Sequence, residues 1–288
     1  MTGMTPVALV LVLAAAAAHA TWNLLVKRAG GGAAFVWLSG WVSAALYAPL
    51  AAAVVLWQRP HWGWIQWAFI AGTVGFHVLY FLLLQGAYAL GELSLVYPLA
   101  RGTGPLLSAA AAIAWFGERP TPVGAVGIAL IGAGVIILAG SPASARVPRA
   151  RHAVAYALAI GVVIAAYTLW DKRAVTALAI PPILSEWSGD VGRAIVLTPL
   201  AWARRSGVRA LWAAHRAEVI GTGVLSPLAY ILVLTALVFT PVSYVAPARE
   251  VSILIGTFMG ARLLEEEDAR RRLIAAAAMF VGLAALVL

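Results

Sequence analysis

The feature that most constrains this chain is a series of ten apolar runs, each long enough to cross a lipid bilayer as a helix. A membrane-spanning helix needs roughly 20 mostly apolar residues and satisfies its backbone polar groups internally. The runs lie near residues 5–27, 33–57, 63–90, 93–116, 121–140, 153–171, 182–203, 216–239, 242–264 and 271–288. Most connections between them are too short for a separate domain. The sequence therefore predicts an all-α integral membrane protein with ten transmembrane helices.

Composition points the same way. Hydrophobic residues make up 63% of the chain, charged residues make up 11%, and the mean hydropathy is +0.93, whereas soluble domains are about 45–50% apolar. The absence of cysteine excludes disulfides, thiolate metal sites and a cysteine nucleophile. The net charge of +9 comes from short clusters of Lys and Arg between apolar runs, as is typical where a protein meets anionic lipid. We therefore expect membrane lipids, and not nucleic acid, as partners.

The two halves of the chain share an internal repeat. Sliding the sequence by 148 residues aligns His19, Trp22 and Asn23 with Tyr167, Trp170 and Asp171, Arg101 with Arg249, and Glu118 with Glu266. Each half has five helices, an odd number, so two halves of one fold must enter the membrane in opposite directions. The predicted organisation is an inverted 5+5 repeat, with a first unit over residues 1–140, a linker over 141–151 and a second unit over 152–288.

Several motifs carry a family resemblance. His19-Ala-Thr-Trp22-Asn23 with Lys27, the Pro98/Arg101 region, and the ending Gly117-Glu118-Arg119 stand in the first repeat. Together with the 5+5 repeat, they resemble the EamA-type permeases of the drug/metabolite transporter superfamily over the whole chain. The second repeat departs from the pattern, since it reads Leu264-Glu265-Glu266-Glu267. The resemblance implies a secondary transporter of the inner (plasma) membrane that exports amino acids or other metabolites, without fixing the substrate.

The distribution of Lys and Arg predicts an orientation. Thirteen of the 20 follow the first, third, fifth, seventh and ninth runs, four lie in the connections on the opposite side, and Arg101, Arg193 and Arg249 fall inside runs. The positive-inside rule therefore puts both termini outside the cytoplasm. The family resemblance implies the reverse, because exporters of this type have both termini in the cytoplasm.

Ionisable residues inside a membrane helix are costly unless they face protein or water, which makes them functional candidates. Arg101 and Arg249 occupy matched positions in helices interrupted by Pro98, Pro105 and Pro247, and broken helices form the sites of inverted-repeat transporters. A guanidinium suits a carboxylate; a pairing of Arg249 with Glu250 is the structural alternative. Aromatic and polar residues at helical spacing complete the predicted lining. The candidate substrate-binding residues are His19, Trp22, Asn23, His77, Tyr80, Tyr97, Arg101, Tyr167, Trp170, Tyr230 and Arg249.

The run 182–203 adds a second charged set. Glu186, Asp190 and Arg193 are spaced i, i+4 and i+7, so they share one helix face and can neutralise one another. One negative charge is left over, which suits a proton or an ammonium group. With Glu250, these three are candidates for coupling or for charge pairing, and an interhelical salt bridge is an equal alternative.

These features predict an exporter working by alternating access around a central cavity, with amino acids, aromatic or hydrophobic ones included, as the favoured small-molecule substrate. A cationic-drug exporter is the rival within transporters, and a nucleotide-sugar transporter ranks third because it would need more basic groups. The alternatives of another class are an intramembrane enzyme and a scaffold. The five histidines are scattered and no nucleophile or metal motif is present, so we expect neither catalysis nor a cofactor. The oligomeric state stays open, and a monomer is compatible with the sequence.

Overall fold

The computed structural model describes residues 3–90, 93–139, 148–203, 205–255 and 269–288, and this part of the chain is helical without a strand. The helices are α1 (Pro6–Arg28), α2 (Ala33–Gln58), α3 (Trp64–Leu90), α4 (Leu93–Phe116), α5 (Pro122–Ala139), α6 (Pro148–Thr176), α7 (Pro182–Ala203), α8 (Arg205–Phe239), α9 (Val242–Ala248) and α11 (Ala269–Val287). Within these ranges, five helices are long and apolar enough to cross a membrane, namely α1, α2, α3, α6 and α8. This finding agrees with the expectation of a membrane protein.

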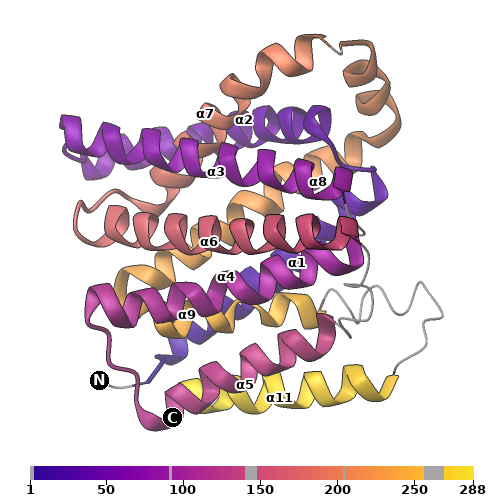
Figure 1. The fold of residues 1–288 in the computed structure, drawn as a ribbon. Coiled ribbons are helices and arrows are strands. Elements are labelled where there is room, and N and C mark those ends of the chain that lie inside the picture. Colours follow the sequence, from indigo (N-terminus) through magenta and orange to yellow (C-terminus); the bar gives the residue numbers. More distant parts are fainter. Residues whose placement is uncertain (1–2, 91–92, 140–147, 204, 256–268) are drawn as a thin grey trace.

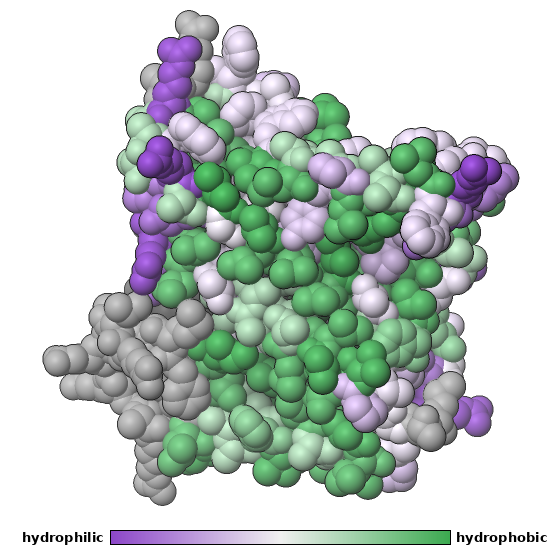
Figure 2. Space-filling view, turned by 180° about the vertical axis from the view of Figure 1, so that it is seen from behind, coloured by the Kyte–Doolittle hydropathy of each residue, from purple (hydrophilic) through white to green (hydrophobic). Residues whose placement is uncertain are grey.

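The helices form one bundle and run back and forth between its two ends (Figure 1). The N- and C-terminal segments meet, because the Met4 N–H donates a hydrogen bond to the Leu286 carbonyl. We call this the terminal end. Lys27, Arg28, Arg209 and Arg216 are exposed at the opposite end, which we call the basic end. Much of the outer face of the bundle between the two ends is hydrophobic (Figure 2).

Packing pairs helices from the two halves of the chain. α1 lies against α8, α3 lies against α6, α2 lies against α7, and α5 lies against α11. Glycines allow the last pair to approach closely, since a Cβ on Gly127 would meet the backbone of Gly282 in α11. The main hydrophobic core consists largely of buried side chains from α1, α5, α8, α9 and α11, among them Tyr244 and Met279.

Glycine also sets the sharp turns. Gly30, Gly31 and Gly32 all have positive φ and reverse the chain between α1 and α2, a conformation that costs other residues free energy. Gly117, with φ of 65°, ends α4 in the same way. The Glu118 N–H donates a hydrogen bond to the Ala112 carbonyl. This turn directs the Glu118 side chain inward, where it is 8% exposed.

Three segments differ from the expected runs. α6 begins at Pro148, inside the predicted linker 141–151, and continues to Thr176. α8 begins at Arg205 instead of near residue 216, and it contains a non-helical residue at His215. The run predicted over 242–264 is broken: α9 ends at Ala248, Arg249 and Glu250 form a turn, and helical backbone resumes over 251–255. Residues 256–264 of this run lie outside the described part.

Candidate functional site

A buried carboxylate joins three helices in the middle of the bundle. Asp171 of α6 has no exposed surface. Its two oxygens accept hydrogen bonds from the Thr73 hydroxyl of α3 at 2.6 Å and from the Tyr230 hydroxyl of α8 at 2.7 Å. His77 lies one turn after Thr73, and its Nδ1 is 2.9 Å from the Thr73 carbonyl oxygen, to which it can donate. The group thus links α3 of the first half of the chain to α6 and α8 of the second.

Aromatic rings surround this carboxylate. The Tyr167 ring stacks on the His77 ring with centroids 4.9 Å apart and planes at 28°. Tyr80 and Tyr230 present their edges to Tyr167, with centroid distances of 6.3 Å and 6.2 Å. Such edge and stacked contacts each stabilise by roughly 0.5–1.5 kcal/mol beyond burial. The rings form an apolar wall with polar rims, a lining that suits a small organic molecule.

Trp170 forms a neighbouring part of the wall. Its indole stacks on Phe69 with centroids 4.0 Å apart, meets the edge of Phe76, and donates to the Phe69 carbonyl at 2.9 Å. A Cβ on Gly72 would overlap the indole. Glycine at this position therefore leaves the space in which Trp170 lies flat against α3.

The break after α9 brings a guanidinium to the same rings. Arg249 is 8% exposed, its Nε lies 3.3 Å from a Glu250 carboxylate oxygen, and its Nη2 lies 3.5 Å from the Tyr167 hydroxyl. The alternative pairing with Glu250 is therefore present, and it coexists with a contact to the aromatic group. We use the name central network for Thr73, His77, Tyr80, Tyr167, Asp171, Tyr230, Arg249 and Glu250.

The depth of the central network fits the middle of a membrane. Thr73 lies nine residues after the start of α3 and Tyr230 lies nine residues before the end of α8, both counted from the terminal end. At 1.5 Å per residue, each lies roughly 14 Å inside the bundle, about half the thickness of a 30 Å hydrocarbon core. A carboxylate and a guanidinium at this depth need the polar partners described above.

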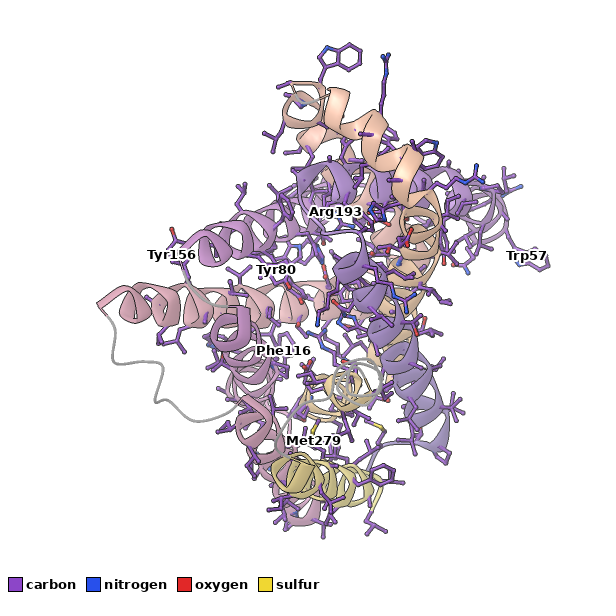
Figure 3. All side chains as sticks on the ribbon, turned by 90° about the vertical axis from the view of Figure 1, so that its right-hand side faces the viewer. Trp57, Tyr80, Phe116, Tyr156, Arg193 and Met279 are labelled. Carbon is purple, nitrogen blue, oxygen red and sulfur yellow. The ribbon has the colours of Figure 1, made fainter. Side chains whose placement is uncertain are left out.

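A second charged group joins α2 and α7. Asp190 of α7 accepts a hydrogen bond from the Ser43 hydroxyl of α2 and forms an ion pair with Arg193 on its own helix. Trp187 donates to the Ala44 carbonyl at 2.9 Å, so a further bond ties the same two helices. Figure 3 shows Arg193 among the helices, in contrast to Trp57, which projects from the periphery. The expected neutralisation along one face holds for Asp190 and Arg193, and Glu186 is buried one turn earlier, at 6% exposure.

The predicted residues of α1 are arranged differently from those of α6. The His19 and Trp22 rings meet edge to face at 4.9 Å, and the Asn23 amide donates to the His19 carbonyl at 2.8 Å. The Asn23 side chain therefore forms its hydrogen bond within α1. Asp171, its counterpart at a shift of 148, accepts hydrogen bonds from two other helices. The side chains of Tyr97 and Arg101 lie outside the described residues.

At the terminal end, polar contacts that the sequence motifs did not reveal link neighbouring elements. The two Glu118 oxygens accept hydrogen bonds from the N–H groups of Val242 and Ser243 at the start of α9, each at 2.8 Å. Lys172 donates to the carbonyls of Leu237 and Thr240 at the end of α8. These contacts fix the turn between α8 and α9 to α6 and to the corner after α4.

A cavity of about 400 Å³ adjoins these contacts. It is lined by Phe116, Glu118, Lys172, Arg173, Thr176, Ala177, Val238, Phe239, Thr240 and Pro241. No residue of the central network borders it, so it is a separate hollow at the terminal end. Within the described ranges, no three His, Asp or Glu side chains form a group that would hold a metal ion.

Thr73, Ser43 and Lys172 were not among the predicted site residues. Asp171 was predicted to share a helix face with Tyr167 and Trp170 but was not among the candidate substrate-binding residues. A weak pattern did exist for Thr73, because it precedes His77 by four residues and so lies on the same helix face. For Ser43, nothing in the sequence distinguishes it from the other small residues of α2.

Comparison with known proteins defines the fold. The chain matches no protein-family model. It matches no curated protein. It is similar to a protein of known crystal structure, with a TM-score of 0.74 and 19% sequence identity, over 98% of each chain. In all, 24 chains of solved structures match. At this identity the likeness extends to the arrangement of helices over the whole chain, and not to an activity.

Proposed function

We propose that the chain is a secondary transporter of the inner (plasma) membrane that exports small metabolites, most favourably amino acids with an aromatic or hydrophobic side chain. It would have ten transmembrane helices in two inverted five-helix repeats and would work by alternating access. The EamA-type family is the proposed relation. The observation that carries the proposal is the central network, in which buried charges and aromatic rings from both halves meet at the break after α9.

The pairing of helices supports the inverted repeat. In an inverted repeat, α1 corresponds to α6 and α3 corresponds to α8. The contact between α1 and α8 then corresponds to the contact between α6 and α3, and both contacts are extensive. By the same correspondence, the α2–α7 pair is its own counterpart. Thr73 and Thr222 also occupy related places in α3 and α8, at a separation close to the 148-residue shift. A two-fold relation of this kind is the basis of rocking movements in inverted-repeat transporters.

The chemistry of the network supports a zwitterionic substrate with an apolar body. The Arg249 guanidinium is suited to a carboxylate. The Asp171 carboxylate is suited to an ammonium group, and the Tyr167, His77 and Tyr80 rings are suited to a side chain. Because these groups are supplied by helices of both repeats, a change in their relative position would alter the site.

A cationic exporter is a second candidate, and Asp171 favours it. This carboxylate is fully buried, and two hydroxyls donate hydrogen bonds to it. An organic cation would then neutralise it at the aromatic wall, where cation–π contacts add to the attraction.

Transport by the purified protein in proteoliposomes tests the proposal. Wild type should carry radiolabelled aromatic amino acids, Arg249→Ala should abolish this transport, and Arg59→Ala, at an exposed position of the terminal end, should leave it unchanged. Thermal unfolding and gel filtration confirm that each variant is folded. Unchanged transport by folded Arg249→Ala would rule the proposed role out.

Transport of an organic cation by wild type separates the two candidates, and Asp171→Asn tests the role of the carboxylate. A cationic-drug exporter should lose transport of organic cations such as tetraphenylphosphonium in this variant, while an amino-acid exporter should not carry that cation in wild type at all. A thermal-shift screen with amino acids, organic cations and nucleotide sugars gives an independent answer, since a ligand that binds only the folded state must stabilise it.

A further inference from the structure

α8 is about ten residues longer than a single membrane span needs. α8 contains 35 residues, which at 1.5 Å per residue make it roughly 50 Å long, whereas the hydrocarbon core is about 30 Å thick. His215 interrupts the helix with φ of −132° and ψ of 30°. The part after His215 is long enough to cross the core by itself, so the crossing does not need residues 205–214. Figure 1 shows this stretch projecting beyond α2 at the upper right.

One side of this stretch is anchored to the protein. Leu211 packs against the buried residues Phe35 of α2 and Val219 of α8, and Val26 near the end of α1 joins the same cluster. The stretch is therefore held at the basic end of the bundle, next to the exposed Lys27 and Arg28. Figure 2 shows hydrophilic residues along the edge of the bundle that corresponds to this end, next to the apolar surface.

The other side is basic and aromatic. Arg209 and Trp212 are spaced i and i+3, so they share one helix face. Arg216 follows directly after the interruption at His215, and all three side chains are exposed. The nearby Glu218 carboxylate lies 3.7 Å from Nδ1 of His215. A helix with cationic groups beside an indole, lying at the boundary of the apolar surface, has the character of an interfacial membrane helix.

We propose that Arg209, Trp212 and Arg216, together with Lys27 and Arg28, form a surface that binds the headgroups of anionic phospholipids in the adjacent leaflet. The guanidinium and ammonium groups meet lipid phosphates, and the Trp212 indole occupies the headgroup boundary. Binding of this kind would hold the α7–α8 corner in the interface. The surface is independent of whether the chain is a transporter.

Brominated lipids test the proposal on the full chain. The protein is reconstituted in phosphatidylcholine vesicles with an increasing fraction of brominated phosphatidylglycerol or brominated phosphatidylcholine, and Trp212 quenching is taken as the difference between wild type and Trp212→Phe. Phosphatidylglycerol should quench at several-fold lower fractions than phosphatidylcholine. A cation near an anionic surface contributes about fivefold in affinity, so Arg209→Gln/Arg216→Gln should lower the selectivity by up to roughly 25-fold.

The matched control is Arg59→Gln/Arg119→Gln, which removes two exposed arginines from the terminal end and should keep the selectivity. Salt at 1 M should weaken the wild-type preference, because the Debye length falls to about 3 Å, and this measurement needs no variant to fold. Equal quenching by the two lipids in wild type would overturn the proposal. Undiminished selectivity in Arg209→Gln/Arg216→Gln, or an equal loss in the control, would overturn it as well.

Discussion

Glu118 offers the sharpest test of how the two halves of the chain are joined. Its two oxygens hold the N–H groups of Val242 and Ser243, both fully buried, each at 2.8 Å. A hydrogen bond to a charged group contributes about 1.5–3 kcal/mol, and a buried donor left without a partner costs about 1–3 kcal/mol. The negative charge at the start of α9 adds a smaller helix-dipole contribution.

Glu118→Ala removes both acceptors, so we expect it to lower the free energy of unfolding by about 3–5 kcal/mol. Glu118→Gln keeps one acceptor oxygen but turns its amide N–H₂ toward the second N–H, so we expect a loss of about 2–3 kcal/mol. Arg119→Gln is the control, because it changes the exposed neighbouring residue and should alter the free energy by less than about 0.5 kcal/mol.

Equilibrium unfolding in mixed dodecylmaltoside and sodium dodecyl sulfate micelles, followed by tryptophan fluorescence, measures these free energies. The expected order of loss is Glu118→Ala, then Glu118→Gln, then Arg119→Gln. A Glu118→Gln variant as stable as wild type would refute the reasoning, since it would mean that the two N–H groups need no carboxylate.

Four glycine substitutions, one of them a control, test the turn after α4 and the helix packing by the same unfolding assay. Gly117→Ala places a side chain at φ of 65°, so it should cost about 1 kcal/mol; no loss would exclude strain at this turn. Gly72→Ala should displace the Trp170 indole and cost about 1–3 kcal/mol, whereas Gly75→Ala, where a Cβ meets nothing within 4 Å, should be neutral or slightly stabilising; equal effects would contradict the packing. Gly127→Leu should push α5 away from α11 and lower the free energy of unfolding by about 2–3 kcal/mol or more. A variant as stable as wild type would show that this pair is not closely packed.

Much of the helix arrangement could be read from the sequence because local chemistry determines it. The apolar runs predicted α1 and α2 almost to the residue, since the glycines at 30–32 and the Arg59-Pro60 pair end each helix wherever it packs. The boundary of α8 was missed because its first ten residues are helical without being part of an apolar run. Pro247 indicated that the helix would break near Arg249. The sequence did not indicate that the break would bring Arg249 to Tyr167.

The site was only partly predictable. Helical spacing placed Tyr167, Trp170 and Asp171 on one face of α6, and they do face the neighbouring helices. The same reasoning predicted that His19, Trp22 and Asn23 form the corresponding face of α1. In the structure the Asn23 amide donates its hydrogen bond within α1. Spacing along one helix reveals which residues share a face, and it does not reveal which helix that face meets.

The sequence by itself determined that this chain forms long apolar helices, where most of them end, and which polar residues lie within them. Only the tertiary structure decided that Asp171 is held by Thr73 and Tyr230, and that Glu118 caps a helix more than a hundred residues later. The physical reason is that these helices are apolar on nearly every side, so the pattern of hydrophobic residues does not distinguish a face toward lipid from a face toward protein. The buried polar groups make that distinction, because each needs a partner that only the assembled bundle supplies.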